Sequence, residues 1–138
     1  MRIWGIGATW GDKPMLDEFG KKHAVAIGWE EEEAPGLYAM MNQVQIGDII
    51  YVKSFVIKGK VLHIKAVGTV TSTAYSQPPL LGENKKAINV KWLEKPESFK
   101  EILHPLSEEE MRYNVYNNTF YEELNPDIIE IIMNLYSK

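Results

Sequence analysis

Apolar and polar residues alternate along the middle of the chain, which is the pattern of half-buried β-strands. The longest such stretch is 61–73, in which Leu62, Ile64 and Ala66 occupy alternate positions. Gly68 interrupts this stretch where a curled sheet needs a bulge or a tight bend. Alternation or an enrichment in β-branched and aromatic residues predicts further strands over residues 2–8, 48–55, 87–93 and 119–124, and the compact apolar run 24–27 before Gly28 predicts a short buried one.

Helical spacing of apolar residues is limited to short segments between these strands. Asp12 has the side chain of a helix cap and precedes Pro14, so a short helix is expected to begin there. Residues 37–44 place their apolar side chains on one side of a second short helix. The sequence therefore predicts helices that flank a sheet and do not form a bundle.

The last third of the chain carries two capping signals. Ser107 and Glu110 have the spacing of a capping box, and Asn125 followed by Pro126 marks the start of an isoleucine-rich helix. Many strands with few short helices predict an α+β fold, a curled and mostly antiparallel β-barrel with short flanking helices. The length allows one hydrophobic core, so we expect residues 1–138 to form a single domain.

The composition narrows the class of protein. The chain lacks cysteine, which excludes disulfides, thiolate zinc sites and thiol nucleophiles. It has no run of eighteen apolar residues, and its first residues lack the pattern of a signal peptide. We therefore expect a cytoplasmic protein that does not enter a membrane.

Patterns that carry catalysis are absent from the sequence. The three histidines, His23, His63 and His104, are far apart and show no metal-ligand spacing. No glycine-rich phosphate-binding loop follows a predicted strand. The acidic run from Glu30 to Glu33 is interpreted as a solvated loop and not as a metal site. We expect neither an enzyme nor a bound cofactor or metal.

The charge is unevenly distributed. The chain has a net charge of −4, but residues 53–91 hold seven lysines and one acid, Glu83, for a local charge of +6. A segregated basic section can attract a polyanion even on an acidic protein. Solvated strand faces are an equally good explanation of these lysines. The candidates for phosphate contacts are Lys53, Lys58, Lys60, Lys85 and Lys86.

Three aromatic residues fall in predicted loops at strand ends: Trp10, Trp29 and Tyr75. Trp4 and Trp92 fall within strands and are expected in the core. Exposed rings can stack on a nucleic-acid base, which contributes about 1–3 kcal/mol per base. Two such walls can hold a base that has been flipped out of its strand, although core packing is the commoner role of any one aromatic residue.

The order of several short segments resembles a known family. These segments are IWGIGA, AVAIGWEE, QIGDIIYVKSF, KAVGTVTSTAY, INVKW and NNTFYEEL. Together they cover nearly all of the chain and resemble the EVE-type domains of the PUA-like superfamily. They resemble more distantly the YTH domains, which read methylated adenine, and the N-terminal modules of modification-dependent restriction systems. The resemblance implies a PUA-like fold that binds a nucleic acid.

The resemblance also implies a base-binding pocket. Trp29 matches the first aromatic wall of that pocket, and the acid that follows it, Glu30, fits the EVE type. The second wall comes from the segment AYSQPPLLGENKK, which lacks tryptophan, so Tyr75, Leu80 or Leu81 has to supply it.

A polar group after the first strand contacts the edge of the base in this family. The candidates here are Thr9 and Asp12, on either side of Trp10.

We therefore expect a non-catalytic module that recognises a base, most simply a modified one, in DNA or RNA. Two alternatives remain. The pocket could sense a free nucleoside or another small molecule, or the chain could be a protein-interaction module of a defence or toxin system. In the last case Met40, Met41 and the C-terminal helix would form a dimer face.

Overall fold

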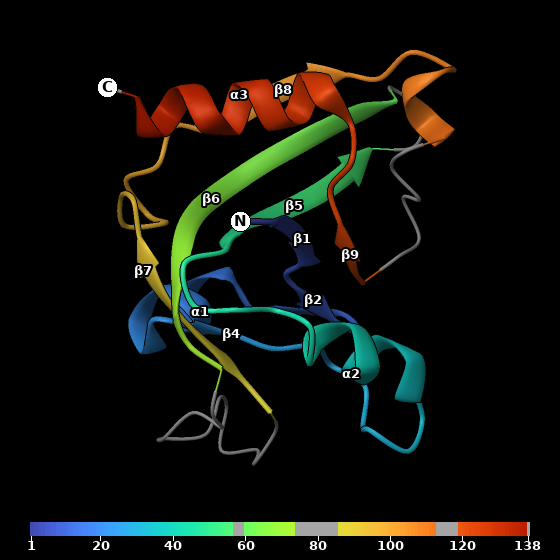
Figure 1. Ribbon diagram of the computed structural model, residues 1–138, viewed down its shortest axis with the longest axis vertical. Helices are drawn as coiled ribbons and strands as arrows, with labels where there is room; N and C mark the ends of the chain where they lie inside the picture. Colours follow the sequence, from blue (N-terminus) through green and yellow to red (C-terminus); the bar gives the residue numbers. More distant parts are fainter. Residues whose placement is uncertain (57–59, 74–85, 113–118, 138) are drawn as a thin grey trace.

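The computed structural model describes residues 1–56, 60–73, 86–112 and 119–137 (Figure 1). In these residues the α-helices are α1 (Leu16–Lys22), α2 (Pro35–Met41) and α3 (Pro126–Tyr136), with one 3-10 turn, η1 (Glu110–Arg112). The strands are β1 (Ile3–Gly7), β2 (Thr9–Trp10), β3 (Lys13–Pro14), β4 (Ala24–Val25), β5 (Ile49–Val56), β6 (Val61–Ser72), β7 (Ile88–Trp92), β8 (Ile102–Pro105) and β9 (Phe120–Glu122).

One curled sheet organises the molecule. Its strands follow the order β4-β7-β6-β5-β1-β9, and β8 pairs with β6 beside this path. Strands β1 and β5 are parallel, and the other pairs of this sheet are antiparallel. The long strand β6 bends around the molecule, so the sheet forms a half-barrel (Figure 1). This confirms an α+β fold with a curled, mostly antiparallel sheet.

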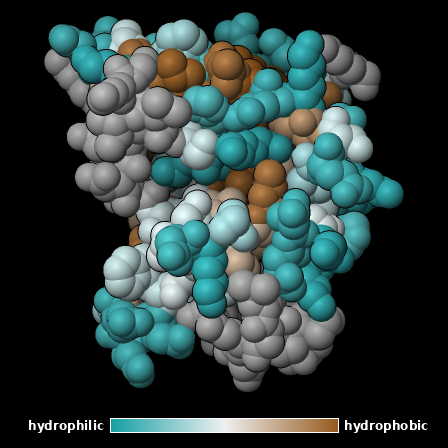
Figure 2. Space-filling view, turned by 180° about the vertical axis from the view of Figure 1, so that it is seen from behind, coloured by the Kyte–Doolittle hydropathy of each residue, from teal (hydrophilic) through white to brown (hydrophobic). Residues whose placement is uncertain are grey.

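The helices lie at the two ends of the half-barrel. Helix α3 crosses one end, whereas α1 and α2 lie at the other end (Figure 1). Two apolar clusters fill the faces of the sheet. The first contains Trp4 and Trp92, both buried as expected, and the second contains Ile128 and Ile132 of α3. Seen from behind, hydrophobic side chains gather near the α3 and β8 end and in the middle of that face (Figure 2).

Most of the predicted elements are present. One predicted helix cap does not form, and one strand was not predicted. Asp12 does not cap a helix, because Pro14 pairs with Thr9 in the small β2–β3 ribbon and α1 begins only at Leu16. Gly11 has a φ of +63° in the turn of this ribbon. The sequence also failed to indicate β8, whose exposed Leu103 hides the usual alternation. The cap at Asn125 is confirmed, since its side chain accepts a hydrogen bond from the Asp127 N–H at 3.0 Å.

Gly68 allows the close approach of β6 and β7. A Cβ atom at this position would lie 2.2 Å from the Val90 Cγ1 and 2.9 Å from the Lys91 carbonyl oxygen. We predict that Gly68→Ala lowers the free energy of unfolding by about 1–3 kcal/mol, because the Lys91 oxygen belongs to a paired strand and cannot move aside cheaply.

Denaturant titration of the variant measures this effect. Gly36→Ala is the matched control, because no described residue lies within 4 Å of a Cβ built at Gly36. If both substitutions change the free energy of unfolding equally, the close contact at Gly68 is not what makes its substitution unfavourable.

Candidate functional site

Trp29 projects from a segment whose backbone is held firmly. The four residues from Ala24 to Ile27 are fully buried, yet the Trp29 side chain is 51% exposed. The Tyr38 hydroxyl, from the buried face of α2, donates a hydrogen bond to the Trp29 carbonyl oxygen at 2.7 Å. A large apolar side chain thus remains in solvent on an anchored backbone.

The Trp10 side chain packs against the segment that carries Trp29. Its indole Nε1 donates to the Ala26 carbonyl oxygen at 3.2 Å, and its ring meets Phe19 edge-on at 6.4 Å. A Cβ at Gly28 would lie 2.8 Å from the Trp10 Cγ, so glycine is required for this packing. Trp10 is half-buried against the core. Its place beside Gly28 makes it a support of the Trp29 segment.

The predicted polar candidates lie on exposed neighbouring segments. Thr9 and Asp12 belong to the β2–β3 ribbon that carries Trp10, and both are exposed. Glu30 follows Trp29 directly, and its N–H donates to the Glu33 Oε1 at 3.0 Å. The whole acidic run 30–33 is exposed, as a solvated loop requires.

The predicted second wall lies outside the described residues. This applies to Tyr75, Leu80 and Leu81, and also to Lys58 and Lys85. The strands on either side of this segment are described: β6 ends at Ser72, which pairs with Asn89 of β7. Strand β4 pairs with the start of β7 in antiparallel fashion, so the chain beyond β4 runs toward the end of the sheet where β6 stops and β7 begins.

The three described lysines from the phosphate set have different positions. Lys86 is half-buried just before β7, at the Trp29 end of the sheet. Lys60 is exposed before β6, so all twelve residues of β6, roughly 40 Å of extended chain, separate it from that end. Lys60 stays a candidate for a phosphate contact, but it lies far along β6 from Trp29.

Lys53 is a correction to the predicted phosphate set. Its side chain is only 6% exposed, and its Nζ lies 5.3 Å from the centre of the Tyr121 ring. Burial lowers the pKa of Lys53 to about 8, although the nearby charge of Glu123 acts to raise it. A lysine in this position cannot contact phosphates at the surface, because β5 is covered on both faces.

Glu123 is the centre of a buried polar cluster that the sequence did not indicate. The Tyr51 hydroxyl donates to the Glu123 Oε1, and the Asn125 N–H donates to the Oε2 at 3.1 Å. Burial raises the pKa of Tyr51 well above its usual value, so the hydroxyl stays protonated and remains a donor. The Tyr51 and Tyr121 hydroxyl oxygens lie 2.6 Å apart.

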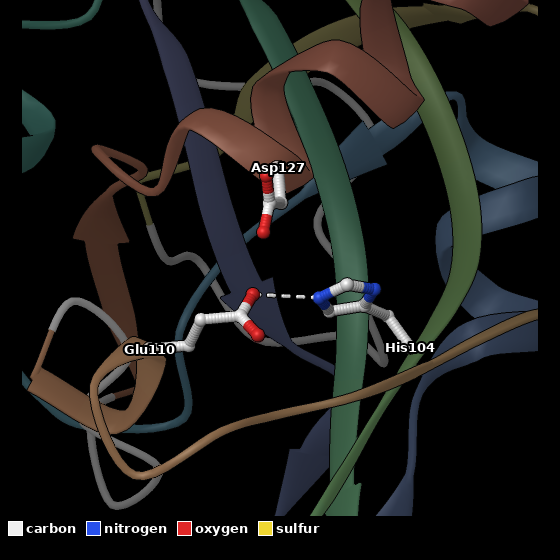
Figure 3. Close-up of side chains that lie close together, drawn as sticks. All are labelled: His104, Glu110 and Asp127. Carbon is white, nitrogen blue, oxygen red and sulfur yellow. Dashed lines mark hydrogen bonds and ion pairs between the residues drawn. The ribbon is translucent and has the colours of Figure 1, made fainter.

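A further cluster of titratable residues lies at the α3 end of the half-barrel, away from Trp29. His104, Glu110 and Asp127 bring their nitrogen and oxygen atoms within 4.8 Å of one another (Figure 3). Burial alone would raise the pKa of Glu110, but hydrogen bonds from Asn125, His104 and the Ser107 N–H together lower it to about 2. Residues 104, 110 and 127 have no recognisable ligand spacing, so local sequence patterns do not indicate this group.

The structure also shows hollows elsewhere on its surface. One of about 350 Å³ lies between α1 and residues 95–97, and one of about 260 Å³ lies between the N-terminal residues, β9 and α3. Neither is lined by Trp29. Met41 is fully buried in the core, so the expected dimer face cannot include it.

The fold and these sites define an α+β protein with a half-barrel sheet and an exposed tryptophan at one end. No known family model matches the chain, and no curated protein matches it. Among solved structures it is similar to the NMR structure of Rpa0253 from Rhodopseudomonas palustris. The identity is 11%, the match covers 98% of this chain and 92% of that one, and the TM-score is 0.49. No helix within the described residues is long and apolar enough to cross a membrane.

Proposed function

We propose that this chain is a non-catalytic nucleic-acid-binding module of the PUA-like, EVE type, in which a base stacks on Trp29. The base is most simply a modified one. The observation that carries this proposal is the 51% exposure of the Trp29 side chain on a segment held by Tyr38 and supported by Trp10. Leaving an indole in water forgoes burial, so an exposed indole on a rigid backbone favours a role in binding.

The second wall of the pocket would come from the segment between β6 and β7. That segment leaves and rejoins the sheet at the end toward which the chain beyond β4 runs. Tyr75, Leu80 and Leu81 are the candidates. An aromatic or aliphatic partner across from the Trp29 ring would hold a flipped base between two apolar faces.

Selectivity among bases would come from polar side chains beside the ring. The carboxylates of Glu30 and Asp12 are exposed acceptors, and the Thr9 hydroxyl can both donate and accept. A carboxylate favours bases that present an amino or ring N–H group at their edge. An N-methyl group on the base would add apolar area, and a positive charge on an alkylated base would strengthen its attraction to the aromatic wall.

The placement of the lysines favours a small phosphate footprint. Lys53 is buried and Lys60 lies at the far end of β6, which leaves Lys86 as the described lysine of the predicted set near Trp29. This supports a second candidate function, a sensor of a free nucleoside. A reader with few phosphate contacts has a shallow dependence of affinity on salt.

Tryptophan fluorescence titration separates these functions. We expect a short oligonucleotide with a modified base to bind more tightly than the same sequence unmodified and than the free modified nucleoside. Its affinity should fall only modestly between low and moderate salt. Equal affinity for the nucleoside would identify a sensor. Absence of binding to either ligand would contradict both functions and favour a protein-interaction module.

A further inference from the structure

Three elements bring potential metal ligands to one point at the α3 end of the half-barrel. His104 lies on β8, Glu110 begins η1, and Asp127 lies in the first turn of α3. In Figure 3 the Asp127 carboxylate is directed toward the facing His104 and Glu110 side chains. One ligand atom from each residue lies within 4.8 Å of the other two. The His104 Nε2 and the Glu110 Oε2 are the closest pair described, at 2.7 Å.

Hydrogen bonds from surrounding residues hold the Glu110 carboxylate in place. The Ser107 N–H donates to Oε1 at 3.2 Å, while the Glu110 N–H donates to the Ser107 Oγ at 3.1 Å, which confirms the predicted capping box. The Asn125 Nδ2 donates to Oε2 at 3.0 Å. Such supporting hydrogen bonds orient carboxylate ligands in metal sites, and they reduce the entropy lost when a metal binds.

The Asp127 carboxylate, unlike that of Glu110, is not held in place by neighbouring residues of the described structure. It is exposed, and within the described part of the chain it makes no hydrogen bond or ion pair through its side chain. The helix N-terminus favours an acid at this position. The helix N-terminus does not explain why the Asp127 carboxylate is directed toward Glu110, because two like charges at this separation repel each other. A divalent cation between them would reverse the sign of that interaction.

We propose that His104, Glu110 and Asp127 bind a divalent transition-metal ion of the Zn²⁺ class. Imidazole nitrogen with two carboxylate oxygens is a ligand set that Zn²⁺ accepts, at about 2.0–2.2 Å from the metal. Ligands of a tetrahedral site then lie about 3.3 Å apart, which follows from those bond lengths. The 2.7 Å pair has to open slightly and the exposed Asp127 side chain has to close in. Water completes the coordination.

Binding replaces the hydrogen bond between His104 and Glu110. The metal uses the lone pair of the His104 Nε2, so the imidazole proton is carried by Nδ1, and a proton previously on Nε2 moves there or leaves to solvent. The metal then links β8, η1 and the start of α3. Its role is structural, and it is independent of the base-binding function proposed for Trp29.

Asp127→Asn is the informative variant, because the Asp127 side chain supports nothing else in the described structure. Calorimetric titration of the full chain with Zn²⁺ should give one equivalent bound, and Zn²⁺ should raise the melting temperature until chelator is added. We expect Asp127→Asn to weaken Zn²⁺ binding by about tenfold or more. In chelator its melting temperature should change only slightly, because the lost interaction with the helix N-terminus is opposed by the lost repulsion from Glu110.

The control is His63→Gln. His63 and Glu101 form a similar pair, with the Nδ1 2.6 Å from the Oε1, but among the described residues no third ligand lies close to that pair. This variant should bind Zn²⁺ normally. The proposal is overturned if Zn²⁺ does not bind at one equivalent, if Asp127→Asn binds it as tightly as the unsubstituted chain, or if His63→Gln abolishes binding. None of these results bears on oligonucleotide binding, so the two proposals fail separately.

Discussion

Trp29→Ala is expected to weaken binding of the preferred base by about 5- to 150-fold, which corresponds to about 1–3 kcal/mol of lost stacking. The same substitution should change the free energy of unfolding little, because half of the side chain is already in solvent. The Tyr38 hydroxyl bonds to the Trp29 backbone carbonyl and not to the indole, so this anchor survives the substitution.

Oligonucleotide titration, followed by a signal on the ligand, measures this loss without depending on tryptophan fluorescence. Leu103→Ala is the matched control, since Leu103 is 58% exposed on β8, which pairs with the first residues of β6, away from the Trp29 end of the sheet. Unchanged affinity in Trp29→Ala would remove the pocket assignment. A loss shared by Leu103→Ala would point to a general effect on the fold.

Glu123→Ala is expected to lower the free energy of unfolding by about 3–5 kcal/mol, the range for removing one member of a buried charged pair. Glu123 is 2% exposed and Lys53 6% exposed, so neither charge can be rehydrated without opening the sheet. The substitution also removes the acceptor for the Tyr51 hydroxyl and the Asn125 N–H.

The pH dependence of this loss tests its electrostatic cause. Burial lowers the pKa of Lys53 from 10.5 to about 8 in the folded chain, so the folded protein binds fewer protons than the unfolded chain between these two values. The contribution of Lys53 to stability is least favourable below pH 8 and improves as the pH rises toward 10.5. The effect of Glu123→Ala should therefore be smaller at pH 9.5 than at pH 7.

Urea denaturation at the two pH values measures the difference. Glu122→Ala serves as the control, because its exposed carboxylate lies 4.0 Å from the Arg2 Nε and such surface pairs contribute little. An effect of Glu123→Ala that is the same at both pH values would mean that packing and hydrogen bonds, and not the Lys53 charge, determine the loss.

Local patterns were enough to predict most of the strands. Alternation identified β6 and β7, and the Asn125-Pro126 pair identified the start of α3. Both signals act within a few residues, because a strand exposes alternate side chains and a cap satisfies N–H groups one turn away. The exposed position of Trp29 also agrees with its place after a short buried strand.

The same reasoning failed at Asp12, where a neighbouring segment forms a two-stranded ribbon in place of a helix start. Asp12 looked like a helix cap, but the Met15 N–H donates to the Ala8 carbonyl oxygen at 2.6 Å, and Thr9 pairs with Pro14. The ribbon satisfies backbone groups that a helix would have used. The cap is thus lost to a competing local structure, which the Asp12 side chain alone could not reveal.

The sequence by itself determined the class of fold, the succession of its main strands along the chain and the presence of a tryptophan at a strand end. Only the tertiary structure decided which charges are available. Lys53 is buried because residues from distant parts of the chain cover both faces of β5, and Lys60 is remote because β6 is long. His104, Glu110 and Asp127 meet only because the fold brings β8, η1 and the first turn of α3 together. Alternation and capping act over a few residues, whereas burial and side-chain proximity depend on contacts across the whole chain.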